Sequence, residues 1–311
     1  MTSLLTNNAA MTALQTLTQT NKSLEMTQNR ISTGQRVASA SDNAAYWSIA
    51  TTMRSDRSSL STVQDALGLG SGVIDTAYST VNNALKVVGQ IKDKLVAARQ
   101  PGVDRAKVQS EISELQKTLQ GMADAGSFSG ENWLSVDSSA TGYNATKTIV
   151  ASFTRSSSSV SIGTISVDTT TTKLYDANAA ADGILDGSRD ATGAVSASGT
   201  FTVSSLDIST LTDSATDLTT LENYITGVDK AFGEMTSSAA TLGAVKARID
   251  IQKDFVKSLM DAIDTGVGQL VDADMNEEST KLQALQVQAQ LGVQALSIAN
   301  QSSQNILSLF R

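Results

Sequence analysis

Residues 60–98 read LSTVQDALGLGSGVIDTAYSTVNNALKVVGQIKDKLVAA. From Leu60 to Ala98, apolar or small residues recur in alternating steps of three and four without a break. A heptad this persistent is typical of a long helix that packs against other helices in a coiled coil. The sequence predicts one continuous helix over about 42–100, because Pro101-Gly102 then ends the pattern.

Further heptads lie on both sides of this stretch. The first covers residues 7–31 and stops at Gly34, a residue suited to a helix C-terminus. Others cover residues 108–122, 218–270 and 282–310. The order is therefore an end helix, bundle helices, a different centre, a bundle helix and a second end helix.

The centre of the chain changes character. Residues 135–212 are rich in serine, threonine and small residues and show no long helical period. Short runs of alternating, β-branched residues predict strands there. These runs are residues 147–154, 160–167 and 200–208.

These patterns predict a mainly α fold. We expect a long antiparallel coiled-coil helical bundle made from both chain ends, with a small β-containing, loop-rich central insertion at the tip. The expected parts are end helices at 1–44 plus 272–311, a rod-like helical bundle at 45–137 plus 213–271, and a surface-exposed central region at 138–212.

The composition excludes several classes of function. The net charge of −8 argues against nucleic acid and against an anionic membrane surface as partners. The chain has no cysteine and no histidine, so it has no thiolate or imidazole to bind a metal or to act in catalysis. We expect no catalytic residue, no cofactor and no metal.

The two ends of the chain carry no charge. Residues 2–21 and 282–310 contain no ionisable side chain, although both have helical periodicity. Such helices are poorly solvated alone and suit a position surrounded by other protein. We expect them to order between copies of the chain. The apolar residues expected at that subunit interface are Leu14, Leu17, Leu24, Ile31, Leu282, Leu285, Leu296, Ile306 and Phe310.

Two motifs resemble ligand sites only superficially. The glycines at 68, 70 and 72 lack the preceding strand and the spacing of a dinucleotide-binding loop, so close packing explains them better. Asp272 and Asp274 resemble the start of a calcium loop, but Glu277 stands where that loop needs glycine. An acidic cluster that favours a helix N-terminus is the better interpretation.

No signal for export or membrane insertion is evident. Residues 1–13 lack the basic and apolar regions of a Sec-type signal peptide. No window is apolar enough to span a bilayer. We therefore expect a soluble chain that leaves the cell, if at all, by another route.

Three segments resemble bacterial flagellins. Residues 30–45, RISTGQRVASASDNAA, are similar to the N-terminal signature of that family. Residues 128–134, FSGENWL, are similar to the element that closes its N-terminal region, and residues 285–311 resemble its C-terminal helix. The resemblance covers about 1–137 and 220–311. Tyr46-Trp47 departs from the common pattern and resembles flagellins of soil-dwelling alphaproteobacteria, whose filaments contain several flagellins.

The resemblance implies a function and partners. It implies a structural subunit of the flagellar filament, whose end helices line an inner tube and whose centre faces solvent. The implied partners are other copies, related flagellins, the flagellar export apparatus with its chaperone, and the hook-associated and cap proteins. Some flagellins are recognised by a vertebrate Toll-like receptor through a surface that matches residues 90–95 and 111–114. The arginine expected near Gln90 is absent, which predicts weak activation.

Two alternatives remain open on sequence. A hook–filament junction protein of the same superfamily shares such end helices but does not polymerise at length. The central region could instead carry an enzyme with acidic catalytic residues. The lack of histidine excludes a zinc protease there.

Overall fold

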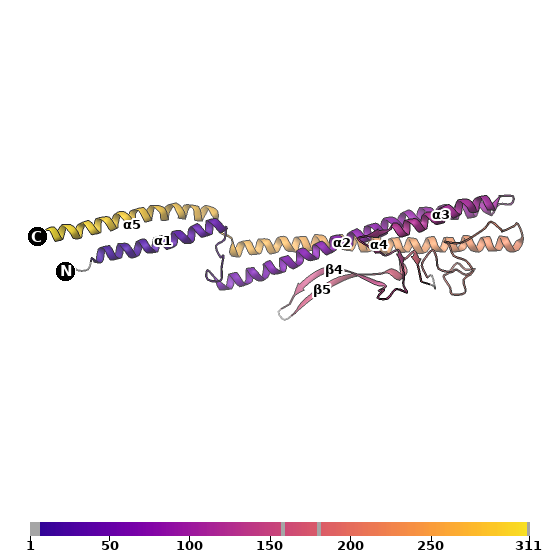
Figure 1. The fold of residues 1–311 in the computed structure, drawn as a ribbon, viewed down its shortest axis with the longest axis horizontal. Helices are drawn as coiled ribbons and strands as arrows, with labels where there is room; N and C mark the ends of the chain where they lie inside the picture. The colour runs from indigo at the N-terminus through magenta and orange to yellow at the C-terminus, as the bar shows by residue number, and fades with distance from the viewer. Residues whose placement is uncertain (1–6, 157–158, 179–181, 310–311) are drawn as a thin grey trace. The chain divides into compact units, whose positions relative to one another are not determined.

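A computed structural model describes residues 7–156, 159–178 and 182–309, and for 302–309 only the course of the helix. The fold is mainly helical, as predicted (Figure 1). Its long helices are α1 (Asn8–Thr33), α2 (Ala44–Ala98), α3 (Arg105–Ala125), α4 (Ala215–Val271) and α5 (Met275–Leu309).

The chain divides into two compact units. Unit 1 contains residues 1–58 and 260–311, and unit 2 contains residues 59–259. Unit 1 therefore holds α1, α5, the start of α2 and the end of α4. Unit 2 holds the rest of α2 and α4, all of α3, and the strands.

The helices begin and end at residues that satisfy their terminal backbone groups. The side chain of Asn7 accepts a hydrogen bond from the N–H of Ala10, and α1 ends at Gly34 with a left-handed φ of 70°. The side chain of Asn43 accepts from two N–H groups in the first turn of α2. Asp104 caps α3 in the same way. Each cap stabilises its helix by about 1 kcal/mol.

The heptad of α2 forms the centre of unit 2. All of its predicted positions are buried, which confirms the interpretation of residues 60–98. They are Leu60, Val63, Leu67, Gly70, Ile74, Ala77, Val81, Ala84, Val88, Ile91, Leu95 and Ala98. A helix with a continuous buried seam and a solvated outer face is amphipathic along its whole length.

Helices α2 and α4 run antiparallel in one constant register. Ion pairs join Asp75 to Lys246 at 2.5 Å, Lys92 to Asp229 at 2.6 Å, and Arg99 to Glu222 at 2.7 Å. From one pair to the next, both helices advance by the same number of residues. These pairs are exposed, and each stabilises the fold by less than about 1 kcal/mol. They therefore show the register of the two helices but contribute little to maintaining it.

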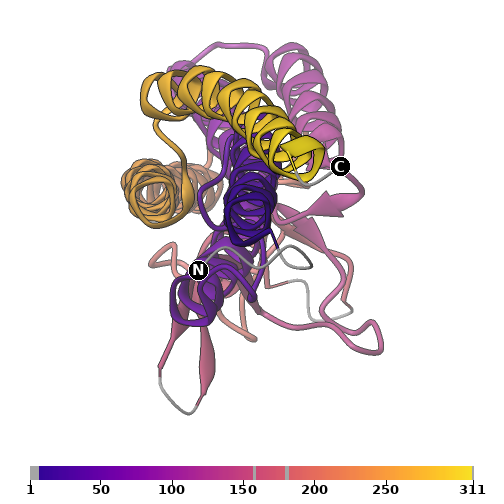
Figure 2. The ribbon, with the colours of Figure 1, turned by 90° about the vertical axis from the view of Figure 1, so that its left-hand side faces the viewer.

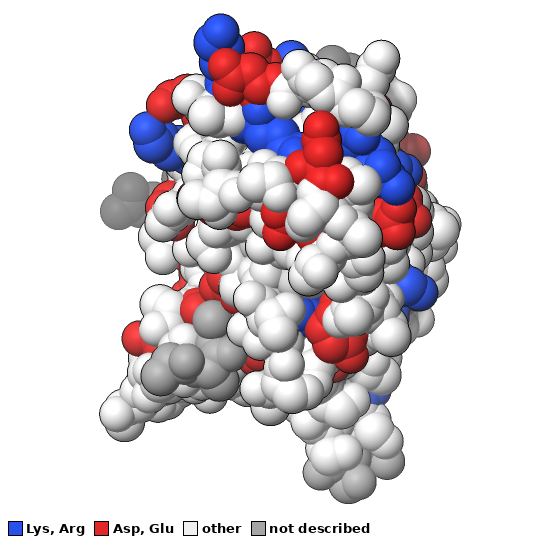
Figure 3. All heavy atoms as spheres, turned by 90° about the vertical axis from the view of Figure 1, so that its right-hand side faces the viewer, with Lys and Arg blue, Asp and Glu red and all other residues white. Residues whose placement is uncertain are grey.

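The buried side chain of Arg105 ties the ends of three helices together. Its guanidinium donates to the carbonyls of Ala98 and Leu211, both at 3.1 Å, and pairs with Asp213 at 2.6 Å. The first residue of α3 is thereby fixed to the end of α2 and to the segment that enters α4. Figure 3 views the structure from the side of the α2–α3 turn and shows charges of both signs interspersed with uncharged residues.

The strands form small sheets of two strands each. β1 (Ser127–Phe128) and β2 (Glu131–Asn132) join through a tight turn at Ser129 and Gly130, which both have positive φ. β4 (Thr146–Arg155) and β5 (Val160–Asp168) form an antiparallel hairpin with an irregularity between Val150 and Ser152. β3 (Ser135–Val136) pairs in parallel with β6 (Tyr175–Asp176).

The prediction of strands is confirmed for β4 and β5 and is wrong for residues 200–208. That segment has one isolated bridge, from Phe201 to Arg189, and is otherwise a loop. Its alternating apolar side chains are buried against the helices. The side chains of Gln109 and Gln116 on α3 donate to its carbonyls. These helix side chains take the place of a partner strand.

The small, strand-containing central region is confirmed, and it lies along the side of the bundle helices. The β4–β5 hairpin packs along the side of α2, where Gly70 leaves room for it, and β1 packs on the same helix at Gly72 (Figure 1). A Cβ on Gly70 would lie 2.5 Å from Cγ2 of Ile149 in β4, and one on Gly72 would lie 2.6 Å from the ring of Phe128 in β1. Close packing is therefore the role of Gly70 and Gly72, as the sequence indicates, whereas a Cβ at Gly68 would meet no atom within 4 Å.

A buried arginine fixes the rest of the central region to α4. The guanidinium of Arg189 donates to the carbonyls of Ile184 at 2.6 Å and Gly193 at 2.7 Å, and it pairs with Glu234 of α4 at 2.6 Å. The arginine is fully buried and the glutamate partly exposed. Removing Glu234 would leave the buried guanidinium without an opposite charge, so the pair favours this placement of the loops on α4.

Candidate functional site: the terminal helix pair

Helices α1 and α5 lie side by side and antiparallel within unit 1 (Figures 1 and 2). Near one end of the pair, the side-chain amide of Asn7 donates to the carbonyl of Ala299 at 3.0 Å. Further along, Gly292 lies against Leu17, whose Cδ1 would be 3.2 Å from a Cβ at the glycine. The two uncharged ends of the chain therefore meet.

Backbone pairing anchors the base of the helix pair. The N–H groups of Arg36 and Val37 donate to the carbonyl of Val271 at 2.6 and 3.2 Å, and the N–H of Ala273 donates to Gly34 at 3.0 Å. Val37 also packs in a small apolar core with Ala50, Val267 and Val271. The segments that connect α1 to α2 and α4 to α5 are thus fixed to each other.

An ion pair crosses between the two helices near this base. A guanidinium nitrogen of Arg30 lies 3.0 Å from Oε1 of Glu278, whose side chain is only 8% exposed. Asp274 caps the start of α5 by accepting from the N–H groups of Asn276 and Glu277. Asp274 thus acts at a helix N-terminus, as the acidic cluster predicts.

The seam of α5 follows its predicted heptad. The partly or fully buried positions from 282 to 299 repeat in steps of three and four. They are Leu282, Leu285, Ala289, Gly292, Leu296 and Ala299. The expected interface residues Leu282, Leu285 and Leu296 therefore already contact protein within one copy.

The buried face of α1 differs in part from the face that its heptad predicts. Leu17, Leu24 and Ile31 are partly buried, but Ala13, Thr20 and Thr27 are the seam positions between them. Leu14 is on the outside and is 54% exposed. Of the other expected residues, the side chain of Ile306 and all of Phe310 lie outside the described residues.

A second apolar surface runs along α5. We call Ala284, Val287, Leu291, Ala295 and Ile298 the α5 stripe; their spacing of three and four places them on one helix face, away from the seam. All are exposed, Leu291 by 57% and Ile298 by 69%. On α1, Met11 and Leu14 form a similar exposed pair.

The α5 stripe is the surface that sequence reasoning missed. The heptad of α5 predicts the seam. The additional apolar residues between its positions indicate a second apolar face. Covering the exposed part of one such side chain stabilises an assembly by about 1 kcal/mol. Because no charged side chain lies nearby, the α5 stripe is suited to contact other uncharged protein surfaces.

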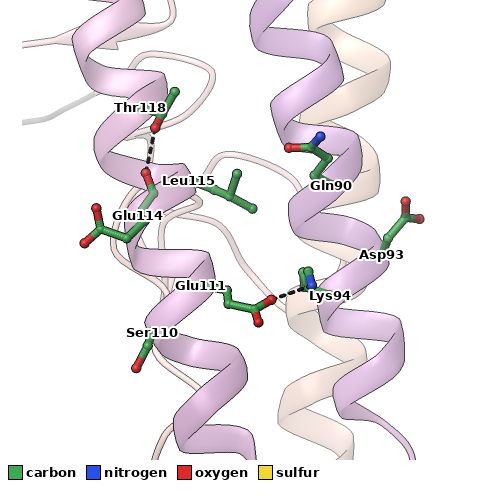
Figure 4. A pocket seen from close by; sticks show the side chains of 8 residues that line it. All are labelled: Gln90, Asp93, Lys94, Ser110, Glu111, Glu114, Leu115 and Thr118. Carbon is green, nitrogen blue, oxygen red and sulfur yellow. Dashed lines mark hydrogen bonds and ion pairs between the residues drawn. The ribbon is translucent and has the colours of Figure 1, made fainter.

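A groove lies between α2 and α3 in unit 2 (Figure 4). We define the α2–α3 groove by Gln90, Asp93, Lys94, Ser110, Glu111, Glu114, Leu115 and Thr118, which enclose about 680 Å³. Leu115 points into the space between the helices, and Lys94 pairs with Glu111 across it. This is the surface that the resemblance associates with receptor recognition.

The described residues contain no cluster of acidic side chains that could hold a metal ion. Within the same part of the chain, no helix is long and apolar enough to cross a membrane.

Comparisons with known proteins agree with these features. Residues 4–139 match the family model of the bacterial flagellin N-terminal helical region, and residues 225–310 match that of the C-terminal helical region. The chain is 51% identical to flagellin C and 44% identical to flagellin A of Rhizobium meliloti strain 1021. It is 47% identical to a flagellin of Brucella melitensis biotype 1. Each alignment covers the full length of both chains.

Proposed function

The chain belongs to the bacterial flagellin family, and we propose that its helices α1 and α5 polymerise with those of other copies to form the inner tube of the flagellar filament. As a flagellin it is a structural subunit of the extracellular filament that bacteria use to swim. Nothing observed favours a hook–filament junction protein.

The observation that carries the proposal is the uncharged, exposed apolar surface of the terminal helices. The α5 stripe, with Met11 and Leu14 on α1, has no covering layer within the described residues. A lone α1–α5 pair buries only its seam, so much of its possible stabilisation is gained on assembly. The expected interface residues then have two roles: Leu17, Leu24, Ile31, Leu282, Leu285 and Leu296 hold the pair together, and Leu14 contacts neighbours.

The remaining parts of the proposal concern organisation and partners. We retain the division into inner-tube helices (1–44 plus 272–311), rod-like bundle (45–137 plus 213–271) and variable surface region (138–212). Related flagellins are expected to co-assemble. The export apparatus, its chaperone, and the hook-associated and cap proteins are the other partners, since a filament subunit has to be exported and then added at an end. A screen for protease and glycosidase activity tests whether the central region is free of catalysis.

Deletion of residues 1–30 or 285–311 tests the proposal. Each shortened chain should remain a soluble, mostly helical monomer, because unit 2 keeps its own core, and it should fail to form filaments. Seeding purified full-length monomer onto filament fragments should give elongation, which separates a filament subunit from a junction protein. Filaments formed by both deletion variants would contradict the proposed role of the ends.

A further inference from the structure

A short turn in the central region lies against the segment that leads into β6. We call residues 182–187 the Asp186 turn. Two of its backbone N–H groups donate to the carbonyls of Lys173 and Leu174, at 3.1 and 2.9 Å. The next bond uses a side chain, because Oδ2 of Asp186 accepts from the N–H of Asp176 at 2.7 Å. The carboxyl group of Asp186 therefore completes the attachment of the turn to β6.

This carboxyl group is poorly compensated. Asp186 is half-buried, and its Oδ1 is buried without a hydrogen-bond partner among the described residues. The buried ammonium of Lys173 already serves two other carboxylates, Asp176 at 2.6 Å and Asp182 at 2.5 Å. A partly buried carboxylate without a cation is costly to keep ionised.

The neighbouring strand and α3 add no positive charge beside Asp186. The hydroxyl of Tyr175 in β6 is buried and has no hydrogen-bond partner in the described structure. Burial raises the pKa of Tyr175, and the negative charges of Asp186 and of Asp124 on α3 raise it further. Negative charge therefore dominates on this side of the turn.

On the side of α4, a groove of about 720 Å³ lies between the turn and the helix. Of the α4 charges that line it, Asp229 pairs with Lys92, and Glu234 pairs with Arg189. Lys230 lines the groove as well but, among the described residues, forms no ion pair across it. No cation of α4 thus neutralises the turn in the described part of the chain.

The protonation of Asp186 should therefore change the strength of this attachment. Burial raises the pKa of Asp186, and the charge of Asp176 raises it further, against the lowering effect of the N–H group that donates to it. Stability from a group with a raised pKa is complete below the unfolded-state value of about 3.9 and is lost as the pH rises through the folded-state value. The bond from Asp176 survives protonation, because a neutral carboxyl still accepts through its carbonyl oxygen.

We propose that Asp186 is a proton-controlled latch, which holds the Asp186 turn on residues 173–176 when its carboxyl is protonated and loosens the turn when the carboxyl is ionised. Protonation of Asp176 weakens the same region, but only in stronger acid, because its carboxylate is held ionised by Lys173. The turn is therefore held most tightly in mild acid. This latch lies within one copy and goes beyond the proposed filament function.

Hydrogen exchange of the full-length monomer between pH 4.5 and 7.5 tests the latch, once the rates are corrected for intrinsic exchange. The amides of Ile184, Leu185 and Asp176 should open at least about threefold more often at pH 7.5 than at pH 4.5. The amides of α2 provide an internal reference. Equal opening at the two pH values, or more opening at pH 4.5, would overturn the proposal whether or not the chain forms filaments.

Asp186→Asn separates the latch from a general effect of pH. The variant keeps the shape and an acceptor oxygen but has no charge, so its turn should open at pH 7.5 as rarely as that of the natural chain at pH 4.5. Asp137→Asn, at an exposed position beside the same region, should keep the natural pH profile. An unchanged profile in Asp186→Asn would contradict the latch.

A direct titration keeps the proposal testable if Asp186→Asn does not fold, which circular dichroism reports. The carboxyl carbon of Asp186 in the natural chain is followed by nuclear magnetic resonance as the pH is lowered. Its midpoint should lie above the unfolded-state value of about 3.9. A midpoint at or below that value would overturn the latch.

Discussion

Arg30 and Glu278 are far apart in sequence, yet their side chains join α1 to α5 at 3.0 Å. The carboxylate is nearly buried, and its Oε2 has no hydrogen-bond partner in the described structure. Such a pair contributes little net stability but is costly to break from one side, because the other charge then lacks compensation. The pair therefore favours one alignment of the terminal helices.

Replacing Glu278 with Gln should loosen the helix pair. We expect a loss of about 2 kcal/mol in local stability, since a charged hydrogen bond in a nearly buried site is weakened. Hydrogen exchange of the amides at 20–33 and 279–290 should accelerate about thirtyfold. Glu277→Gln is the control, because Glu277 is exposed one residue away. Equal exchange in both variants would show that the ion pair does not align the helices.

The α5 stripe should matter for polymerisation and not for the monomer. Leu291→Ser removes an exposed apolar side chain, so the melting temperature of the monomer should stay within about 2 °C. The critical concentration for seeded elongation should rise about tenfold, because each added subunit loses apolar burial. Gln290→Ser, which is also exposed, should leave both quantities unchanged. A normal critical concentration for Leu291→Ser would argue against the stripe as an interface.

Two glycines in α2, Gly70 and Gly68, provide a matched pair of substitutions. Gly70→Ala should destabilise unit 2 by about 1–3 kcal/mol, because its Cβ would lie 2.5 Å from the side chain of Ile149. A Cβ added at Gly68 would meet no atom within 4 Å, so Gly68→Ala should stabilise α2 by about 1 kcal/mol. Urea unfolding of the monomer measures both. The same sign of effect for the two variants would mean that β4 does not pack on Gly70.

The central region should lose stability in acid, as Asp176 becomes protonated. Burial alone would raise the pKa of Asp176, but hydrogen bonds from the ammonium of Lys173 at 2.6 Å and from the N–H of Ser138 outweigh it and hold the pKa well below its usual value. The resulting stability is present above the unfolded-state pKa of about 3.9 and is lost as the pH falls below it. The pKa of Asp186 is shifted the other way, upward by burial, so this residue opposes that loss.

Asp176→Asn tests this pH dependence. At pH 7 we expect the central region to lose about 3 kcal/mol, because Lys173 is buried and loses its buried partner. Between pH 5 and about pH 3, the variant should lose less further stability than the natural chain, as hydrogen exchange of the amides in β6 reports. Asp182→Asn is the control, since Asp182 also pairs with Lys173 but is more than half exposed. Parallel pH profiles for the natural chain and Asp176→Asn would contradict the assignment.

The sequence predicts the bundle well because heptads report burial directly. Every expected seam position of α2 from Leu60 to Ala98 is buried, and α1 ends at Gly34, as the sequence predicts. Local signals of this kind act within a few residues. They need no knowledge of which segment lies opposite.

Features that depend on a distant partner were harder to predict. In α1, the positions 10, 17, 24 and 31 belong equally to two seams, one completed by 14, 21 and 28 and the other by 13, 20 and 27. The second seam faces α5, where Gly292 admits Leu17, and this turns Leu14 outward. In the same way, residues 200–208 alternate like a strand but find their hydrogen bonds on α3.

A helical reconstruction of filaments grown from the purified full-length chain tests the central claim most directly. We predict that Leu14, Leu291 and Ile298, which are more than half exposed in the single chain, become buried against the terminal helices of neighbouring copies. Filaments in which these three side chains remain exposed to solvent would contradict the proposed inner tube.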